Sequence, residues 1–241
     1  MLFGEQWDRL FGGKNSIIGD IQYSTALKAR LQACQGRVLR VDGAQGGGLT
    51  NILKHFEFVQ PRFESFVGPR RKFICCLQAI VMLLCGVAGD PRIEKPRRDR
   101  AEAALEAITP GDIIACGLAA DFAEVCLSFI RTFDVNFHDP ALTLREKREF
   151  IRALQVLFFD GHIVAEIPAD ARMQAFSGGV VAAKTLTQIA LEQCEPMRTF
   201  YYGSRTKVLW SRTAASDTKR ALAHMQDVVE ACIQRVEADL Y

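Results

Sequence analysis

The sequence predicts a mainly helical protein, and three observations lead to that prediction. Two long segments, residues 73–89 and 113–133, are apolar at helical spacing. Helix start signals precede several such segments. Only residues 36–42 and 206–210 alternate polar and apolar side chains as short strands do. We therefore expect a helical bundle of two pseudo-symmetric halves, with a small mixed or two-stranded β element formed by N- and C-terminal segments.

The helix start signals follow from capping chemistry. Thr109 and Pro110 supply an N-cap and a first-turn proline for the apolar segment that follows. Thr143 and Glu146 have the spacing of a capping box, in which hydroxyl and carboxylate satisfy unpaired amides reciprocally. The last helix should begin near Ser216. Its apolar stripe should comprise Leu222, Met225, Val229, Cys232, Val236 and Leu240.

The N-terminal part differs in kind from the rest. We divide the chain into an N-terminal extension, residues 1–68, and a helical core domain, residues 69–241. The extension should hold a helix at 21–33 and a strand at 36–42. The late strand candidate at 206–210 is expected to pair with that strand and so to join the two ends of the chain.

A glycine-rich segment follows the predicted N-terminal strand. Residues 43–50 have the spacing of a phosphate-binding loop, but Leu49 stands where that motif has lysine. Without the ammonium group the loop loses its contact to the terminal phosphates. A glycine connector with Thr50 as N-cap is the simpler interpretation. Nucleotide binding by a degenerate phosphate loop remains the alternative.

Charge and composition restrict the classes of function. The chain has 241 residues, 24% of them charged, and a net charge of only +2, which does not favour nucleic acid as a partner. A local basic patch flanks the first apolar segment, and we predict that it binds a protein partner. The alternative is that these side chains form an ordinary solvated helix face. The residues of the patch are Arg92, Lys95, Arg97, Arg98 and Arg100.

Cysteine usage and the first apolar segment bear on location. The eight cysteines form no C-x-x-C pair and the chain starts without a secretory signal, so we expect a cytoplasmic protein. Residues 73–89 are uncharged, but they fall short of the ~20 residues that cross a membrane and they contain Gln78. We expect a buried core helix and no membrane insertion.

One pattern occurs twice. An apolar segment that begins F-I-x-x-L-Q ends at an aspartate, and an isoleucine follows three residues later. The two aspartates are Asp90 and Asp160, followed by Ile93 and Ile163. The two segments differ in length by seven residues, about two helical turns, so the same face points inward in both. We expect both halves to pack their aliphatic faces into one core, with the two carboxylates near each other.

This helix, turn and charged-helix pattern over residues 70–176 resembles the tellurite-resistance TerB-like helical family. The resemblance implies a domain of two such halves that serves as a module in stress-response assemblies, with acidic turns associated with metal binding. Pro91 stands where the family has glycine, and His162 is an additional candidate ligand. The resemblance implies one candidate cofactor, a divalent metal, with Asp90, Glu94, Asp160 and Glu166 as its ligands. As an alternative, each aspartate is a turn former that accepts backbone hydrogen bonds.

These observations favour a non-catalytic binding module, an adaptor or inhibitor in a multiprotein stress-response, secretion or mobile-element system. A metal-dependent hydrolase is the enzymatic alternative. Its candidate acid and base groups lie on loops that contain no nucleophile motif. No two carboxylates in the sequence have a spacing that marks them as a general acid and a general base. The candidate residues are Asp134, His138, Asp139, Asp160 and His162. We therefore do not expect an enzyme.

Overall fold

The protein is mainly helical, as predicted. The structure is a computed structural model that describes residues 11, 16–42, 51–53, 67–133, 140–164, 185–194, 198–202, 205–209 and 215–238. Its elements are α2 (Ile17–Tyr23), α3 (Thr25–Asp42), α4 (Val67–Cys75), α5 (Leu77–Gly89), α6 (Lys95–Ala107), α7 (Pro110–Phe133), α8 (Pro140–Leu154), the π-helical turn η3 (Gln155–Phe159), α9 (Leu186–Cys194), β1 (Arg198–Tyr202), β2 (Arg205–Leu209) and α10 (Ala215–Ala238).

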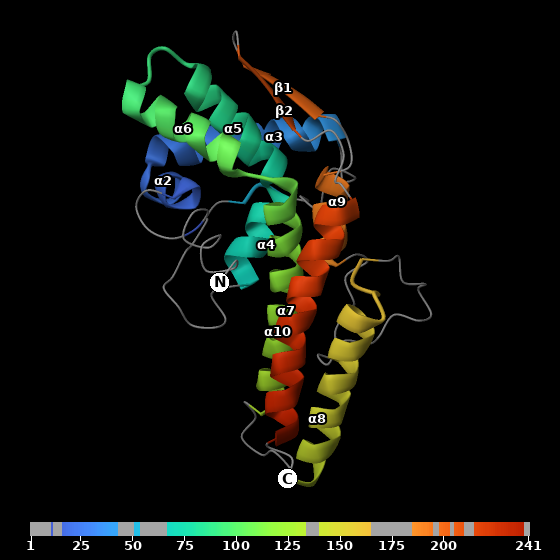
Figure 1. Ribbon diagram of the computed structural model, residues 1–241. Helices are drawn as coiled ribbons and strands as arrows, with labels where there is room; N and C mark the ends of the chain where they lie inside the picture. The colour runs from blue at the N-terminus through green and yellow to red at the C-terminus, as the bar shows by residue number, and fades with distance from the viewer. Residues whose placement is uncertain are drawn as a thin grey trace.

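The helices form two regions (Figure 1). The upper region holds α2, α3, α5 and α6, with the β1–β2 hairpin packed against α5. The lower bundle consists of α7, α8 with η3, and α10. Each region has its own large cluster of buried apolar side chains, which we call the upper and lower clusters.

Helix α7 belongs to both regions. Because successive residues turn by about 100° around a helix, residues three or four apart share a face. One face of α7 enters the upper cluster and another enters the lower cluster. The first carries Ile113, Cys116 and Ala120, and the second carries Ile114, Leu118 and Cys126. Two-sided burial explains why α7 is apolar enough to span a membrane by length and composition, a property that core helices share.

The predicted helix over residues 73–89 is divided. Helices α4 and α5 meet at Cys76 with a bend of 72°. The bend allows α4 to follow α7 while α5 enters the upper region. Almost every side chain of α5 is buried, which accounts for the absence of charge along it.

The N-terminal strand prediction is wrong. Helix α3 continues to Asp42, and its buried residues are spaced at helical intervals. These residues are Leu27, Leu31, Gln35 and Val38. Over seven residues the alternating pattern and the helical pattern coincide, and burial against α5 selects the helix. Strand β2 overlaps the predicted late strand, and its partner is β1, in antiparallel register from Arg198 opposite Leu209 to Tyr202 opposite Arg205.

The helix starts follow the predicted chemistry in part. At α7, the Thr109 hydroxyl accepts from the Asp112 amide at 3.2 Å, and the Asp112 carboxylate accepts from the Thr109 amide at 3.3 Å. Helix α8 instead begins at Pro140, so Thr143 lies inside it and is not the N-cap. Helix α10 begins at Ala215 and buries Met225 and Val229 as predicted. Residues 165–184 and Leu240 lie outside the described residues.

Candidate functional site

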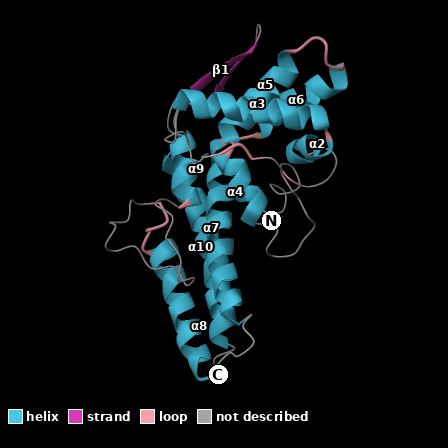
Figure 2. Cartoon of the chain, turned by 180° about the vertical axis from the view of Figure 1, so that it is seen from behind, coloured by secondary structure: helices cyan, strands magenta, loops and turns pink. Residues whose placement is uncertain are grey.

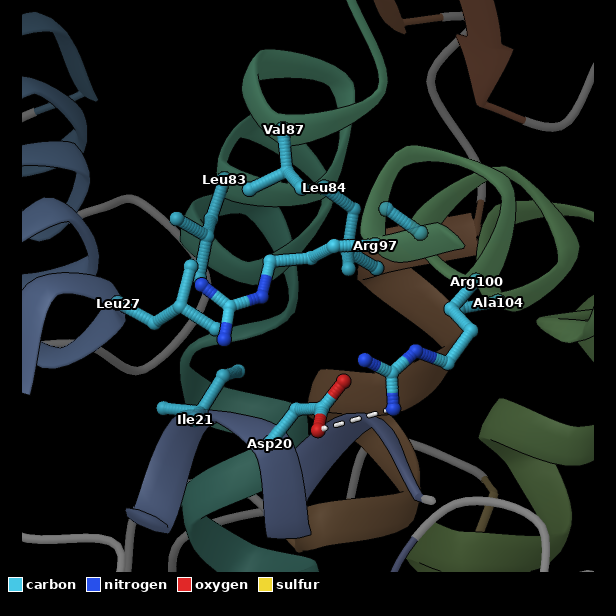
Figure 3. Close-up of a pocket in the computed structure, with 10 residues that line it drawn as sticks. Asp20, Ile21, Leu27, Leu83, Leu84, Val87, Arg97, Arg100 and Ala104 are labelled. Carbon is cyan, nitrogen blue, oxygen red and sulfur yellow. Dashed lines mark ion pairs between the residues drawn. The ribbon is translucent and has the colours of Figure 1, made fainter. Parts of the chain in front are cut away.

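A small cavity lies between the N-terminal helices and the α5–α6 pair, and we call it the α2–α6 groove (Figure 3). Its volume is about 40 Å³. Most of its wall is aliphatic, but three charged side chains reach it. It is lined by Asp20, Ile21, Leu27, Leu83, Leu84, Val87, Arg97, Arg100, Ala101 and Ala104.

The sequence builds this groove from helical spacing. On α6, residues 97, 100, 101 and 104 fall on one face, and two of them are alanines that leave room above α5. Pro96 lies in the first turn of α6, where a missing amide proton costs little. Ser16 caps α2 by accepting from the Gly19 amide at 3.0 Å, and this cap fixes the turn that carries Asp20.

The charges in the groove do not cancel. An Arg100 guanidinium nitrogen lies 3.7 Å from a carboxylate oxygen of Asp20, and the two side chains are 45% and 28% exposed. Arg97 extends from α6 into the groove toward Leu27 and Leu83 (Figure 3). No carboxylate in the described part of the chain pairs with Arg97. The groove therefore carries one uncompensated positive charge beside an aliphatic wall.

The predicted basic patch contributes two of its five side chains to this groove. Arg97 and Arg100 line it, and Arg92, Lys95 and Arg98 lie on the α5–α6 connection or on α6. Residues 91–100 contain five basic and two acidic side chains, so the segment has a net charge of +3. The patch is thus mounted on one short helix and its preceding turn, at the rim of a cavity.

The first aspartate turn is held by local hydrogen bonds. One Asp90 carboxylate oxygen accepts from the Arg92 amide at 3.0 Å, and the other lies 3.4 Å from an Arg30 guanidinium nitrogen. The Asp90 carbonyl accepts from the amide of Ile93, which packs against the upper cluster. Asp90 thus acts as a turn former with a cationic neighbour.

The second aspartate turn lies elsewhere. Asp160 ends η3 and is exposed, and Gly161 follows with φ of 78°, a left-handed conformation suited to glycine. Ile163 is fully buried in the lower cluster. The α5–α6 connection and η3 lie in different regions of the molecule in both views (Figures 1 and 2). The two turns therefore insert their isoleucines into two cores, not the single core that we expected, and the described structure does not bring their carboxylates together.

The other predicted ligands are not assembled in the described part of the chain. Glu94 is exposed, and its carbonyl accepts from the Arg97 and Arg98 amides at 3.1 Å. Among the described residues, no group of three or more His, Cys, Asp and Glu side chains could hold a metal ion. The remaining positions, Glu166, Asp134, His138, Asp139 and the glycine loop at 43–50, lie outside the described residues.

Sequence inspection missed one buried carboxylate. Asp121 of α7 accepts from the amides of Leu186 and Thr187 at 2.9 and 2.8 Å, and from the Thr187 hydroxyl at 2.7 Å. Burial raises the pKa of Asp121 to about 6, although these hydrogen bonds oppose the shift. The signal in the sequence was an acidic residue flanked by alanine and phenylalanine in the apolar middle of α7.

Asp121 closes the N-terminus of α9 together with a capping box. The Thr185 hydroxyl accepts from the Gln188 amide at 3.0 Å, and the Gln188 side-chain oxygen accepts from the Thr185 amide at 3.0 Å. The amides of residues 185–188 all have acceptors. This helix end is already filled by the protein's own carboxylate, so Asp121 has a structural role.

The comparisons with known proteins do not identify a site, so a functional proposal rests on the groove. No protein-family model, curated protein or solved structure matches this chain. The groove offers an unpaired guanidinium and an aliphatic wall, and its one carboxylate already lies beside Arg100. Such a site binds a carboxylate more readily than it moves protons.

Proposed function

We propose that this protein is a non-catalytic binding module that holds an acidic segment of a partner protein on the α2–α6 groove. As an adaptor or inhibitor it would act within a multiprotein system of the stress-response, secretion or mobile-element kind. The observation behind the proposal is Arg97, an arginine that extends into the groove without a carboxylate partner among the described residues.

The size of the groove suits one carboxylate. A buried water needs roughly 10–15 Å³ of such space, so about 40 Å³ holds a few water-sized groups. A carboxylate has three heavy atoms, which is a comparable size. Arginine presents a planar set of donors that matches both oxygens of a carboxylate. An Asp or Glu side chain of the partner would therefore reach Arg97 while its methylene groups contact Leu83 and Val87.

The surrounding cations would act at longer range. Arg92 and Lys95 are exposed and precede Arg97 by five and two residues in the chain. Charges at the rim of an interface mainly increase the association rate and make it dependent on salt. They contribute less to the lifetime of the complex than a desolvated central contact. Arg97 is also exposed in the free protein, but it lines the cavity, where a bound carboxylate would cover it. We accordingly assign the central contact to Arg97 and the steering of an acidic partner to the rim.

The proposal includes the TerB-like arrangement over residues 70–176 and a cytoplasmic location. Each aspartate turn ends an apolar helix and directs an isoleucine toward a core, which supports the duplicated architecture. All eight cysteines are free, which suits a reducing compartment.

Affinity capture with the full chain tests the proposal. Wild type, Arg97→Glu and Lys219→Glu would be used as baits in lysate from the source cells, with bound proteins quantified by mass spectrometry. Lys219 is an exposed cation of α10, outside the groove, so it provides a matched charge reversal. We expect a partner with an acidic segment that Lys219→Glu retains and Arg97→Glu loses by at least about tenfold, a change of ~1.4 kcal/mol. Equal capture by both variants, with helical content unchanged, would contradict it.

A further inference from the structure

Two cysteines lie on packed helices of the lower bundle, against the same cluster of apolar side chains. Cys126 lies on α7 and Cys232 on α10, two helices that pack side by side (Figure 1). Each cysteine belongs to the stripe that its helix turns toward the lower cluster. On α7 that stripe includes Ile114, Leu118 and Cys126, and on α10 it includes Met225, Val229 and Cys232. The two side chains therefore pack on one cluster at the α7–α10 interface, from positions 106 residues apart in the chain.

The two thiols are also chemically unequal. A hydrogen bond joins them and raises the pKa of Cys126, the more buried of the pair. The same hydrogen bond lowers the pKa of Cys232 to about 7. Of the two thiols, Cys232 is therefore the one that ionises more readily. By contrast, burial is the main influence on Cys34 and Cys75, and it raises the pKa of both thiols.

We propose that Cys126 and Cys232 form a redox modification site, a dithiol that hydrogen peroxide oxidises to a disulfide between α7 and α10. Cys232 is half-buried at the bundle surface, so a small oxidant reaches it before it reaches Cys126. This inference does not depend on the proposed binding function.

The reaction is balanced in two steps. The Cys232 thiolate attacks one peroxide oxygen, so that a sulfur–oxygen bond forms, the oxygen–oxygen bond breaks, and the departing hydroxide takes up a proton to give water. The Cys126 sulfur then attacks the Cys232 sulfenic sulfur. A sulfur–sulfur bond forms, the sulfur–oxygen bond breaks, and the Cys126 proton leaves with the hydroxyl group as a second water. Two thiols are oxidised by two electrons while one peroxide is reduced to two waters.

The bond would alter the lower bundle specifically. It would tie the C-terminal helix to α7, the helix that both regions share. Closing a loop of this length restricts the unfolded chain, so the oxidised protein should melt at a higher temperature, by roughly 5–10 °C. Reduction should reverse the change.

Peptide mapping after oxidation tests the inference. The purified full-length protein would be treated with a small molar excess of hydrogen peroxide, blocked with an alkylating agent, digested without reductant and analysed by mass spectrometry. We expect one cross-linked pair of peptides, containing Cys126 and Cys232, and a raised melting temperature that a reductant reverses. A folded protein in which peroxide leaves Cys232 as a sulfinic acid, or links it to another cysteine, would overturn the inference.

Serine variants separate this site from the other thiols. Cys126→Ser and Cys232→Ser should each abolish the rise in melting temperature, whereas Cys34→Ser should retain it. Cys126→Ser should also slow alkylation of Cys232 at pH 7 several-fold, because the thiolate loses its hydrogen-bond donor. Unchanged alkylation in Cys126→Ser, with the bundle still folded, would show that the two thiols do not interact.

Discussion

The upper region and the lower bundle use the same shared helix in different ways. Around the upper cluster, which includes side chains of α9, buried polar contacts join α9 to α7 and to α5, while the lower bundle packs aromatic rings against α7. In the upper region Asp121 closes α9, and Gln78 donates to Gln193 at 3.0 Å. In the lower bundle, Phe129 stacks on Phe150 with ring centroids 4.3 Å apart.

The two regions also place their charges differently. On α8 and α10, the ion pairs Arg145–Glu149 and Arg220–Asp217 each lie at the surface within one helix. Such pairs contribute little to stability and leave no charge for a ligand. In the upper region α6 turns Arg97 and Arg100 toward a cavity. The comparison shows that helices with many charged residues differ in what their charges border: solvent on α8 and α10, and a cavity with an aliphatic wall on α6.

The largest expected effect comes from the lower cluster. Phe158 is fully buried and meets Phe122 edge to face, with ring centroids 6.1 Å apart. Phe158→Ala should lower the free energy of unfolding by about 3–5 kcal/mol in urea titrations. Its neighbour Phe159 is 44% exposed, so Phe159→Ala should change stability by no more than about 1 kcal/mol. Similar losses from both variants would show that the lower bundle is not packed as described.

Asp121 should make the upper region sensitive to pH. Its pKa rises from 3.8 in the unfolded chain to about 6 in the folded protein, because burial disfavours the ionised form. The folded state therefore binds the proton more tightly. This contribution to stability is fully present below pH 3.8 and is lost as the pH rises through about 6. The two-unit difference corresponds to about 3 kcal/mol.

The test measures the free energy of unfolding as a function of pH for three proteins. Wild type and Asp160→Asn, which changes an exposed aspartate, should share the fall in stability between about pH 4 and 6. Asp121→Asn should reduce the slope, because the amide does not titrate in this range. A slope that survives in Asp121→Asn would assign the pH dependence to other groups.

Gly117 tests how closely α7 and α9 approach. A Cβ atom at this position would lie 2.8 Å from the Thr187 Cα and 3.1 Å from the Ala190 Cβ. Gly117→Ala should therefore cost about 1–3 kcal/mol, since backbone must move. Gly111 in the same helix has its nearest such contact at 3.8 Å, so Gly111→Ala should be neutral or slightly stabilising. Chemical denaturation of both variants distinguishes a tight α7–α9 contact from a general helix effect.

The smallest effect should come from the groove itself. The Asp20–Arg100 pair is partly exposed at 3.7 Å, so Arg100→Ala should change the free energy of unfolding by less than about 1 kcal/mol. The thermal unfolding curve should nearly overlay that of wild type. A loss as large as that of Phe158→Ala would mean that the groove is part of the structural core and that binding data on its variants report unfolding.

Much of the helical architecture was predictable because helix signals are local. The Thr109 cap and the buried stripe of α10 follow from neighbouring residues alone. The strand at 36–42 failed because seven residues fit either period, and contact with α5 decided between them. No proline or glycine lies next to Cys76, so the sequence does not predict the bend there.

The candidate site was predictable only in part. The cations of α6 could be recognised as a patch, but the cavity that they line depends on Asp20 and Leu27, which lie 70 residues or more before Arg97 in the chain. Asp121 was missed because the acceptor and its donors are separated by 65 residues. Spacing along one helix does not reveal which distant backbone amides will meet a carboxylate.

A charge-swap binding measurement tests the central claim most directly. The acidic segment of the captured partner would be titrated against wild type and Arg97→Glu by calorimetry, with the partner's contacting carboxylate intact or replaced by lysine. We predict that Arg97→Glu weakens binding at least about tenfold and that the lysine substitution restores much of that loss. Equal affinity of wild type and Arg97→Glu for the unmodified segment would contradict the assignment of the groove as the binding site.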